Sequence, residues 1–261
     1  MCLLLLWLLF QSLQSTPIQD RSYYPFQIVQ GGIIRTDQSQ KQINLVFTGH
    51  EFADGGEHIR SVLAAHAIKA SFFLTGDFYR NTRFSKLIQL LKTDGHYLGA
   101  HSDKHLLYAS WEKRDSLLVT KRQFTEDLLG NYNAMKKFGI TKNDAPYFLP
   151  PYEWYNDSIS AWTLQMGFTL VNFTPGTYSN ADWTHPALNK QYLSSDMILT
   201  RILRYEKTHL HGLNGFILLL HIGTDPRRTD KFYYSLDTLL TELKKQEYRF
   251  TLFQQTIPGK E

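Results

Sequence analysis

The sequence predicts an α/β fold in which a parallel β-sheet is flanked by helices. Short apolar runs alternate with amphipathic stretches from about residue 43 to residue 253, and repeated strand–helix units of this kind build parallel sheets. No linker-like or low-complexity segment interrupts the alternation. Three predicted strands lead into ionisable residues, at His50-Glu51, at His101 and at His221. We therefore expect these side chains to share the face of a parallel α/β barrel on which active sites assemble.

The individual elements follow from the spacing of apolar residues. The first unit is a strand at 43–48 followed by a helix at 59–68, and the second is a strand at 70–74 followed by a helix at 84–91. Gly95 ends that second helix, and a short buried strand at 97–100 then leads into His101. The remaining predicted elements are helices at 118–138, 157–166 and 236–244, and extended segments at 147–149, 216–220 and 248–253.

The N-terminus differs from the rest of the chain. Met1 to Phe10 is almost wholly apolar, and small or polar residues follow up to Ser15. A run of this length is too short to span a bilayer and is typical of a secretory signal. We therefore predict a signal peptide at 1–15, an N-terminal extension at 16–42 and a single domain at 43–261. The mature protein would have no stable membrane span and would be secreted, periplasmic or held in the cell envelope.

Composition excludes several classes of function. The formal net charge is +4 and the charged residues are scattered, which gives no indication of nucleic-acid binding. Cys2 is the only cysteine, so a chain that has lost its signal peptide can form no disulfide. The sequence contains no serine nucleophile elbow, no phosphate-binding glycine loop and no dinucleotide-binding fingerprint. The sequence gives no indication of the oligomeric state.

The segment His101-Ser102-Asp103-Lys104-His105 is the first candidate for a functional site. Two histidines at positions i and i+4 present both imidazoles on one side of a helical turn, which is a common way to hold a divalent metal. A buried strand delivers His101 directly into this turn, which favours a metal site over two histidines that merely satisfy neighbouring hydrogen bonds.

A resemblance to a known family rests on several such segments. Residues 95–105, GHYLGAHSDKH, resemble the second motif of the polysaccharide deacetylase (NodB-homology) superfamily, carbohydrate esterase family 4. Further segments resemble other family elements in the family's order: IKASFFLTG at 68–76, FLPPY at 148–152, ADW at 181–183 and ILLLH at 217–221. The resemblance spans about residues 30–253. It implies a distorted (β/α) barrel with about seven parallel strands, and hydrolysis of acetyl groups on N- or O-acetylated carbohydrate.

The resemblance also implies roles for individual residues. In this family a divalent metal polarises the acetyl carbonyl and activates water. Carried over, His101 and His105 become metal ligands, and His221 becomes the acid that protonates the leaving group. Asp182 would hold and tune His221. The substrate would be an acetylated glycan, contacted by Leu219 and Trp183 around the acetyl methyl and by Tyr152, near which backbone N–H groups would face the oxyanion.

The first motif departs from the family pattern, Thr-Phe-Asp-Asp-Gly, because residues 46–52 read VFTGHEF. Alignment on the threonine puts His50 in the position of the base and Glu51 in that of the third metal ligand. Alignment on the phenylalanine puts Thr48 and Gly49 there instead, which removes both functions. We prefer the first alignment. It gives a site of two histidines and one carboxylate, which suits Zn best and also Co, Ni, Fe or Mn.

Alternatives remain at this motif. His50 could bind the metal together with His101 and His105, with Glu51 as the base, or His50 could be a polar surface residue. Asp54, in the following ADGG turn, could also reach the metal, although a role in the turn or as a helix cap is favoured.

Two other departures affect the expected catalysis. Leu149 stands where the third motif usually begins with arginine, and Ser179 stands at the spacing of the first aspartate of the fourth motif. Both are compatible with a replaced base and also with loss of catalysis. The leading hypothesis is therefore a metal-dependent carbohydrate deacetylase, with Trp154-Tyr155 as a surface for stacking sugars. The alternatives are a catalytically impaired relative that binds metal and glycan, and a hydrolase of a non-sugar amide bond.

Overall fold

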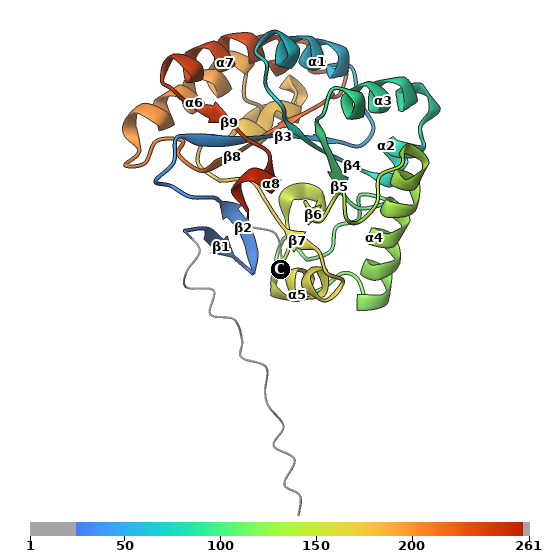
Figure 1. Cartoon of the computed structure of the whole chain (residues 1–261). Helices are drawn as coiled ribbons and strands as arrows, with labels where there is room; N and C mark the ends of the chain where they lie inside the picture. The colour runs from blue at the N-terminus through green and yellow to red at the C-terminus, as the bar shows by residue number, and fades with distance from the viewer. Residues whose placement is uncertain (1–24, 258–261) are drawn as a thin grey trace, which may run out of the picture.

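The computed structural model describes residues 25–257, in which one β-sheet is surrounded by helices (Figure 1). The path through the sheet runs β1 (Gln27–Val29), β2 (Gly32–Arg35), β8 (Phe216–His221), β3 (Gln42–Gly49), β4 (Ser71–Leu74), β5 (Tyr97–Ala100), β6 (Tyr147–Phe148) and β7 (Thr169–Leu170). A further strand, β9 (Arg249–Phe250), pairs with β3 off this path.

The sheet is curled into a distorted barrel. The strands from β8 through β3 to β7 are parallel, whereas β2 is antiparallel both to β8 and to β1. A bridge between Ile33 of β2 and Val171, just after β7, connects the two ends of the parallel set, and Figure 1 shows β2 beside β7. The predicted fold class is thus confirmed. The described residues form nine strands rather than about seven. Strands β1, β2 and β7 were not predicted from the sequence, whereas β9 lies within the extended segment expected at 248–253.

Most of the helices lie around the outside of the sheet, whereas the short last helix lies in the middle of the view, between β9 and β6 (Figure 1). The helices are α1 (Gly56–Ala65), α2 (Gly76–Arg80), α3 (Ser85–Thr93), α4 (Lys121–Met135), α5 (Asp157–Gln165), α6 (Ser195–Thr208), α7 (Leu236–Lys245) and α8 (Phe253–Thr256). Short 3₁₀ turns are η2 (Thr82–Phe84), η3 (Lys136–Phe138), η4 (Pro151–Glu153), η5 (Ser179–Trp183), η6 (Pro186–Gln191) and η7 (Phe232–Ser235). None of the helices between residues 25 and 257 has the length and apolar character needed to cross a bilayer.

The central strands are buried on both faces, as parallel strands covered by helices must be. Every residue of β4 and β5 is buried, and so are the apolar residues of β3 and β8. The rings of Phe47 and Phe72 stack across β3 and β4 with centroids 5.0 Å apart. This packing fixes where each strand ends, and therefore where the residues that follow the strands project. The predicted signal peptide at 1–15 falls outside the described residues.

Candidate active site

Strand register brings the predicted residues to one end of the sheet. Thr48 of β3 pairs with His221 of β8, Gly49 pairs with Leu74 of β4, and Leu74 pairs with Ala100 of β5. His50 and His101 are the residues that follow β3 and β5. Three of the four neighbouring parallel strands β8, β3, β4 and β5 therefore present histidines to a common space from their carboxyl ends, as the sequence predicts.

Three imidazole rings gather there. The rings of His101 and His105 have centroids 5.2 Å apart and are inclined by 60°. The ring of His50 stacks on that of His105, with centroids 4.7 Å apart and planes inclined by only 9°. His50 Nδ1 also lies 3.1 Å from Thr75 Oγ1. His50 is thus part of the cluster rather than an isolated surface residue.

The segment that carries the histidine pair is a turn and not the helical turn that the i, i+4 spacing predicts. Ser102 and His105 have φ values of 73° and 55°, in the left-handed region. The carboxylate of Asp127 on α4 accepts the backbone N–H groups of Asp103 and Lys104, each at 3.1 Å. A side chain from a distant helix therefore fixes this loop, and the imidazoles approach each other through loop geometry.

Both histidines of the pair are held as neutral bases. His101 is buried, and its Nδ1–H donates to the Leu149 carbonyl at 2.8 Å, which leaves the Nε2 lone pair free. Burial lowers the pKa of His101 to about 3. Burial and the neighbouring imidazoles, His101 first, lower the pKa of His105 to about 2. At neutral pH both rings are therefore uncharged, and each has one nitrogen lone pair with which it can bind a metal.

The donor set fits a divalent metal in part. The lone pair of an imidazole lies in the ring plane, so an ion bound by two rings lies in both planes. The inclined rings of His101 and His105 allow this, whereas the stacked, nearly parallel rings of His50 and His105 do not. The side chain of Glu51 is 68% exposed and 3.9 Å from His50 Nε2. Within residues 25–257 no three His, Cys, Asp or Glu side chains already form a metal-binding group.

A second functional pair stands beside this cluster. Asp182 on η5 is buried and accepts two hydrogen bonds from His221, from Nδ1 at 2.6 Å and from the backbone N–H at 2.8 Å. Burial opposes the charged form of His221, but the carboxyl groups of Asp182 and Glu153 outweigh it and raise the pKa of His221. The imidazole is thereby oriented with Nδ1 protonated and favoured in its charged form, which suits a general acid.

Glu153 is a site residue that the sequence analysis missed. It ends η4, directly after the FLPPY segment, and its side chain interacts electrostatically with His221 and Asp182. Burial raises the pKa of Glu153 to about 7, and the negative charge of Asp182 acts in the same direction. Its position in the sequence could have indicated this role, because Glu153 directly follows the FLPPY motif, which was expected to line the site.

Three aromatic side chains, Trp111, Tyr152 and Trp154, form a surface that we call the aromatic platform. The ring centroid of Trp111 lies 5.9 Å from that of Tyr152 and 5.2 Å from that of Trp154. The ring of Tyr152 lies 4.4 Å from that of His105, and the Trp154 indole N–H donates to the Ser110 carbonyl at 3.1 Å. Trp111 and Tyr152 are 56% and 44% exposed. The platform therefore joins the imidazole cluster to solvent.

Other candidates take different places. Tyr155, expected to share the platform, is completely buried and donates its hydroxyl to the Val29 carbonyl at 2.7 Å, so it supports β1 instead. Trp183 is 45% exposed at the end of η5, whereas Leu219 is buried within β8.

Asp54 makes three polar contacts away from the histidines. Its carboxylate accepts the Thr224 backbone N–H at 2.8 Å and the Tyr233 hydroxyl at 3.0 Å, and it lies 2.9 Å from Lys231 Nζ. Asp54 therefore lies in the turn before α1, as the sequence favours, and ties the loop after β3 to the loop after β8. Its side chain does not cap α1, whose N-cap is Gly55 without a side-chain hydrogen bond.

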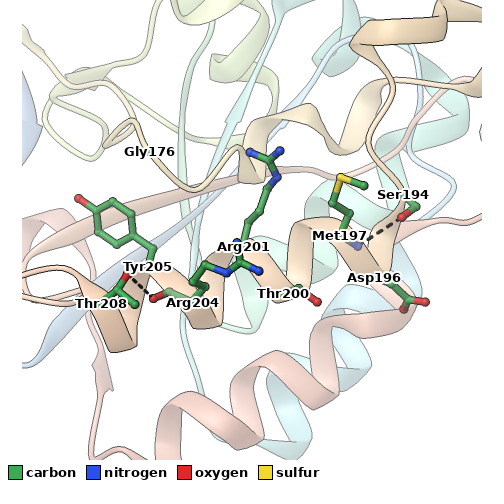
Figure 2. A pocket seen from close by; sticks show the side chains of 9 residues that line it. All are labelled: Gly176, Ser194, Asp196, Met197, Thr200, Arg201, Arg204, Tyr205 and Thr208. Carbon is green, nitrogen blue, oxygen red and sulfur yellow. Dashed lines mark hydrogen bonds between the residues drawn. The ribbon is translucent and has the colours of Figure 1, made fainter.

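A hollow of about 710 Å³ lies elsewhere, along one face of α6 (Figure 2). Arg201, Arg204 and Tyr205 line it together with Gly176, and none of the site histidines does. It is a surface groove that is separate from the candidate active site.

The distorted barrel and the histidines at the carboxyl ends of its strands are the arrangement expected of a carbohydrate esterase. Comparison with known proteins identifies the family. The polysaccharide deacetylase family model matches residues 36–171, just over half of the chain. The chain belongs to this family. The motifs that suggested it in the sequence thus identified it correctly.

Individual relatives are distant. A peptidoglycan-N-acetylglucosamine deacetylase from Bacillus cereus is 25% identical over 199 residues, which cover 76% of this chain and 80% of the relative. The structure of Bacillus subtilis PdaA, a family 4 carbohydrate esterase, is similar with a TM-score of 0.68 at 22% identity, over 87% of this chain and 85% of PdaA. The structure of a CE4 family pseudoenzyme from Bacillus anthracis is similar with a TM-score of 0.64 at 19% identity. The match covers 88% of this chain and 69% of the pseudoenzyme chain.

Proposed function

We propose that the protein is a metal-dependent hydrolase that removes acetyl groups from N- or O-acetylated carbohydrate. The observation that carries this proposal is the arrangement of two neutral imidazoles, the buried His101 and the half-buried His105, beside the His221–Asp182 pair at one end of the sheet. Family membership supports the reaction class. The relative named for peptidoglycan supports an acetylated amino sugar of the cell wall as the substrate class.

The metal would be held by His101 and His105, with Glu51 as the third ligand once its exposed side chain turns inward. Zn fits two histidines and a carboxylate best, and Co, Ni, Fe and Mn fit as well. A bound divalent ion supplies a Lewis acid for the acetyl carbonyl and makes a coordinated water more acidic. The stacking of His50 on His105 favours Glu51 over His50 as the third ligand.

The remaining groups would move protons and hold the substrate. His50 stands beside the metal pair, where it can accept a proton from water. His221, whose Nδ1 is held by Asp182 at 2.6 Å, has Nε2 left to donate a proton to the leaving amine or alkoxide. The aromatic platform would stack a pyranose ring. Trp183 and Leu219 would bound the space for the acetyl methyl group.

A catalytically impaired relative is the second candidate, and specific residues favour it. His50 replaces the usual aspartate base, and Leu149 replaces the arginine that begins the third motif. Leu149 is buried, and its hydrogen bond with His101 is made by its backbone carbonyl and not by its side chain. A protein that bound metal and glycan without turnover would fit these substitutions.

Acetate release distinguishes the candidates. Purified protein would be stripped with a chelator, reloaded with Zn, and assayed on N-acetylglucosamine oligomers, on peptidoglycan fragments and on small non-sugar acetamides. A deacetylase releases acetate only after reloading and only from the sugars, and release from the acetamides alone indicates the amide hydrolase. Metal and glycan binding without acetate release identifies the impaired relative. Failure of the protein to bind any divalent metal contradicts the proposal.

We further propose that the protein is exported to the cell envelope or secreted. The apolar segment at 1–10 and the small residues up to Ser15 support this, together with the wall polymer named for the Bacillus cereus relative. N-terminal sequencing of the protein from the envelope and culture medium tests it. Recovery of the protein with Met1 intact, from the cytoplasm alone, contradicts it.

A further inference from the structure

One face of α4 contacts the loop that carries the histidine pair. Asp127 and Asn131 lie one helical turn apart on this face and are buried, with exposures of 7% and 0%. The Asp127 carboxylate accepts the backbone N–H groups of Asp103 and Lys104, each at 3.1 Å. The side-chain oxygen of Asn131 accepts the backbone N–H of His101 at 2.8 Å. Two side chains of one distant helix thus bind three backbone N–H groups of this loop.

Each of these side chains also binds a second segment. The Asp127 carboxylate accepts the hydroxyl of the buried Tyr108 at 2.6 Å, beyond the histidine pair in the chain. The Asn131 Nδ2 group donates to the carbonyl of Leu74, the last residue of β4, at 3.2 Å. Buried polar groups are costly unless they are hydrogen-bonded. The hydrogen bonds of Asp127 and Asn131 therefore fix the position of the loop relative to both α4 and the sheet.

The loop is also held from α2, on its carbonyl side. The N–H of Gly76 donates to the Ser102 carbonyl at 3.0 Å, and the N–H of Asp77 donates to the Asp103 carbonyl at 3.1 Å. The Asp103 side chain lies between two glycines, because a Cβ at Gly76 would come within 1.8 Å of its Oδ1 and a Cβ at Gly130 within 2.9 Å of its Cγ. Glycine inside a helix such as α4 lowers stability relative to alanine. The close approach of Asp103 explains its presence there.

These contacts maintain a strained backbone. Ser102 and His105 have positive φ values, and non-glycine residues keep this conformation only where their surroundings enforce it. We propose that Asp127 and Asn131 are positioning residues that hold the imidazoles of His101 and His105 at their centroid separation of 5.2 Å, so that a divalent metal meets a preformed pair of ligands. The inference rests on the proposed function for the metal, but the order of the loop can be measured without one.

The first test measures the dissociation constant for Zn in the full chain, by competition with a chromophoric chelator. Asp127→Asn keeps the shape but replaces one acceptor oxygen by an NH₂ group, and Asn131→Ala removes the side-chain acceptor for the His101 N–H. Both should weaken Zn binding about 10-fold or more, as loss of the groups that orient metal ligands typically does. The matched control is Tyr132→Phe, which removes another buried hydrogen bond of α4, from the Tyr132 hydroxyl to the Ala145 carbonyl. It should leave the Zn affinity unchanged.

The second test follows backbone amide exchange by NMR in the metal-free protein. The N–H groups of Asp103 and Lys104 should be protected in the unaltered protein and in Tyr132→Phe. Asp127→Asn should exchange faster at these two positions, because it disturbs their acceptor. Urea denaturation of each metal-free variant shows whether it is folded under the conditions of both tests.

Folded Asp127→Asn and Asn131→Ala proteins that bind Zn as tightly as the unaltered protein overturn the proposal. Rapid exchange of the Asp103 and Lys104 N–H groups in the unaltered protein also overturns it, because the loop would then not be preformed. If Asp127→Asn does not fold, Asn131→Ala decides. If the unaltered protein binds no divalent metal, the proposed function fails, whereas amide exchange still decides whether α4 orders the loop.

Discussion

Replacement of Glu153 by glutamine should stabilise the protein, and only at neutral and alkaline pH. Burial raises the pKa of this carboxyl group from 4.5 to about 7. Its ionised form is therefore disfavoured in the folded state relative to the unfolded chain. The difference of about 2.5 pH units corresponds to about 3.4 kcal/mol, at about 1.36 kcal/mol per unit. Because the side chain is partly solvated, we take about 3 kcal/mol as the upper value.

The sign of this effect sets the pH window. Below pH 4.5 the carboxyl group is protonated in both states, and glutamine changes nothing. Between pH 4.5 and 7 the unfolded chain ionises first, so the unaltered protein loses stability as pH rises, and above pH 7 the loss is constant. Glu153→Gln should therefore raise the free energy of unfolding by up to about 3 kcal/mol at pH 8, with no gain at pH 4.

Urea denaturation followed by tryptophan fluorescence at pH 4, 6 and 8 measures this difference. The control is Glu126→Gln, which exchanges the same groups on an exposed face of α4, where the glutamate side chain is 63% exposed. We expect this control to show no pH-dependent gain. A Glu153→Gln protein that is less stable at pH 8 than the unaltered protein, or equally stable at all three pH values, would refute the reasoning that Glu153 is desolvated beside the site.

Three further predictions concern the other parts of the site. His101→Ala should abolish stoichiometric metal binding, measured by elemental analysis, and lower acetate release at least about 100-fold, since a Lewis acid contributes several kcal/mol; unchanged metal content would contradict the ligand assignment. Asp182→Asn should lower the free energy of unfolding by about 2 kcal/mol. Because the pKa of His221 is raised in the folded protein, the stabilisation by the pair is present below pH 6.5 and lost as pH rises through the folded value. The loss measured by urea denaturation should therefore be larger at pH 6 than at pH 9, and an equal loss at both would show that the pair is not ionic. Trp111→Ala should raise KM for acetylated oligomers about fivefold with kcat unchanged, as removal of about 1 kcal/mol of stacking requires; an equal KM would exclude the platform from glycan binding.

The sequence predicts the strand ends well because burial constrains them strongly. The run Phe216–Leu220 is apolar at every position, a pattern that only a strand covered on both faces tolerates. The end of such a run marks the point at which a polar residue reaches the active-site face. His221 and His101 follow from this argument, whereas His105 follows from its i, i+4 spacing to His101, which the family resemblance supports.

Features that depend on distant parts of the chain were not predictable. The spacing of His101 and His105 suggests a helical turn, but Asp127 from α4 fixes a left-handed loop there. Trp111 lies in a loop whose sequence has no regular pattern. It becomes part of the aromatic platform only through its contacts with Trp154 and Tyr152. The pKa of Glu153 is likewise set by elements that the chain reaches later. Local sequence carries no signal for such contacts.

The place of β2 in the sheet has a consequence for how much of the chain is needed for solubility. β2 lies between β8 and the end of β7, through the pairs Arg35–Phe216 and Ile33–Val171. A protein that began at residue 43 would leave two sheet edges open, each with unpaired backbone N–H and carbonyl groups. Exposed edges of this kind pair with edges of other molecules and promote aggregation. Residues 27–35 therefore cover these two edges and prevent the sheets of separate molecules from pairing. A protein that lacks these residues should self-associate, which sedimentation experiments would detect.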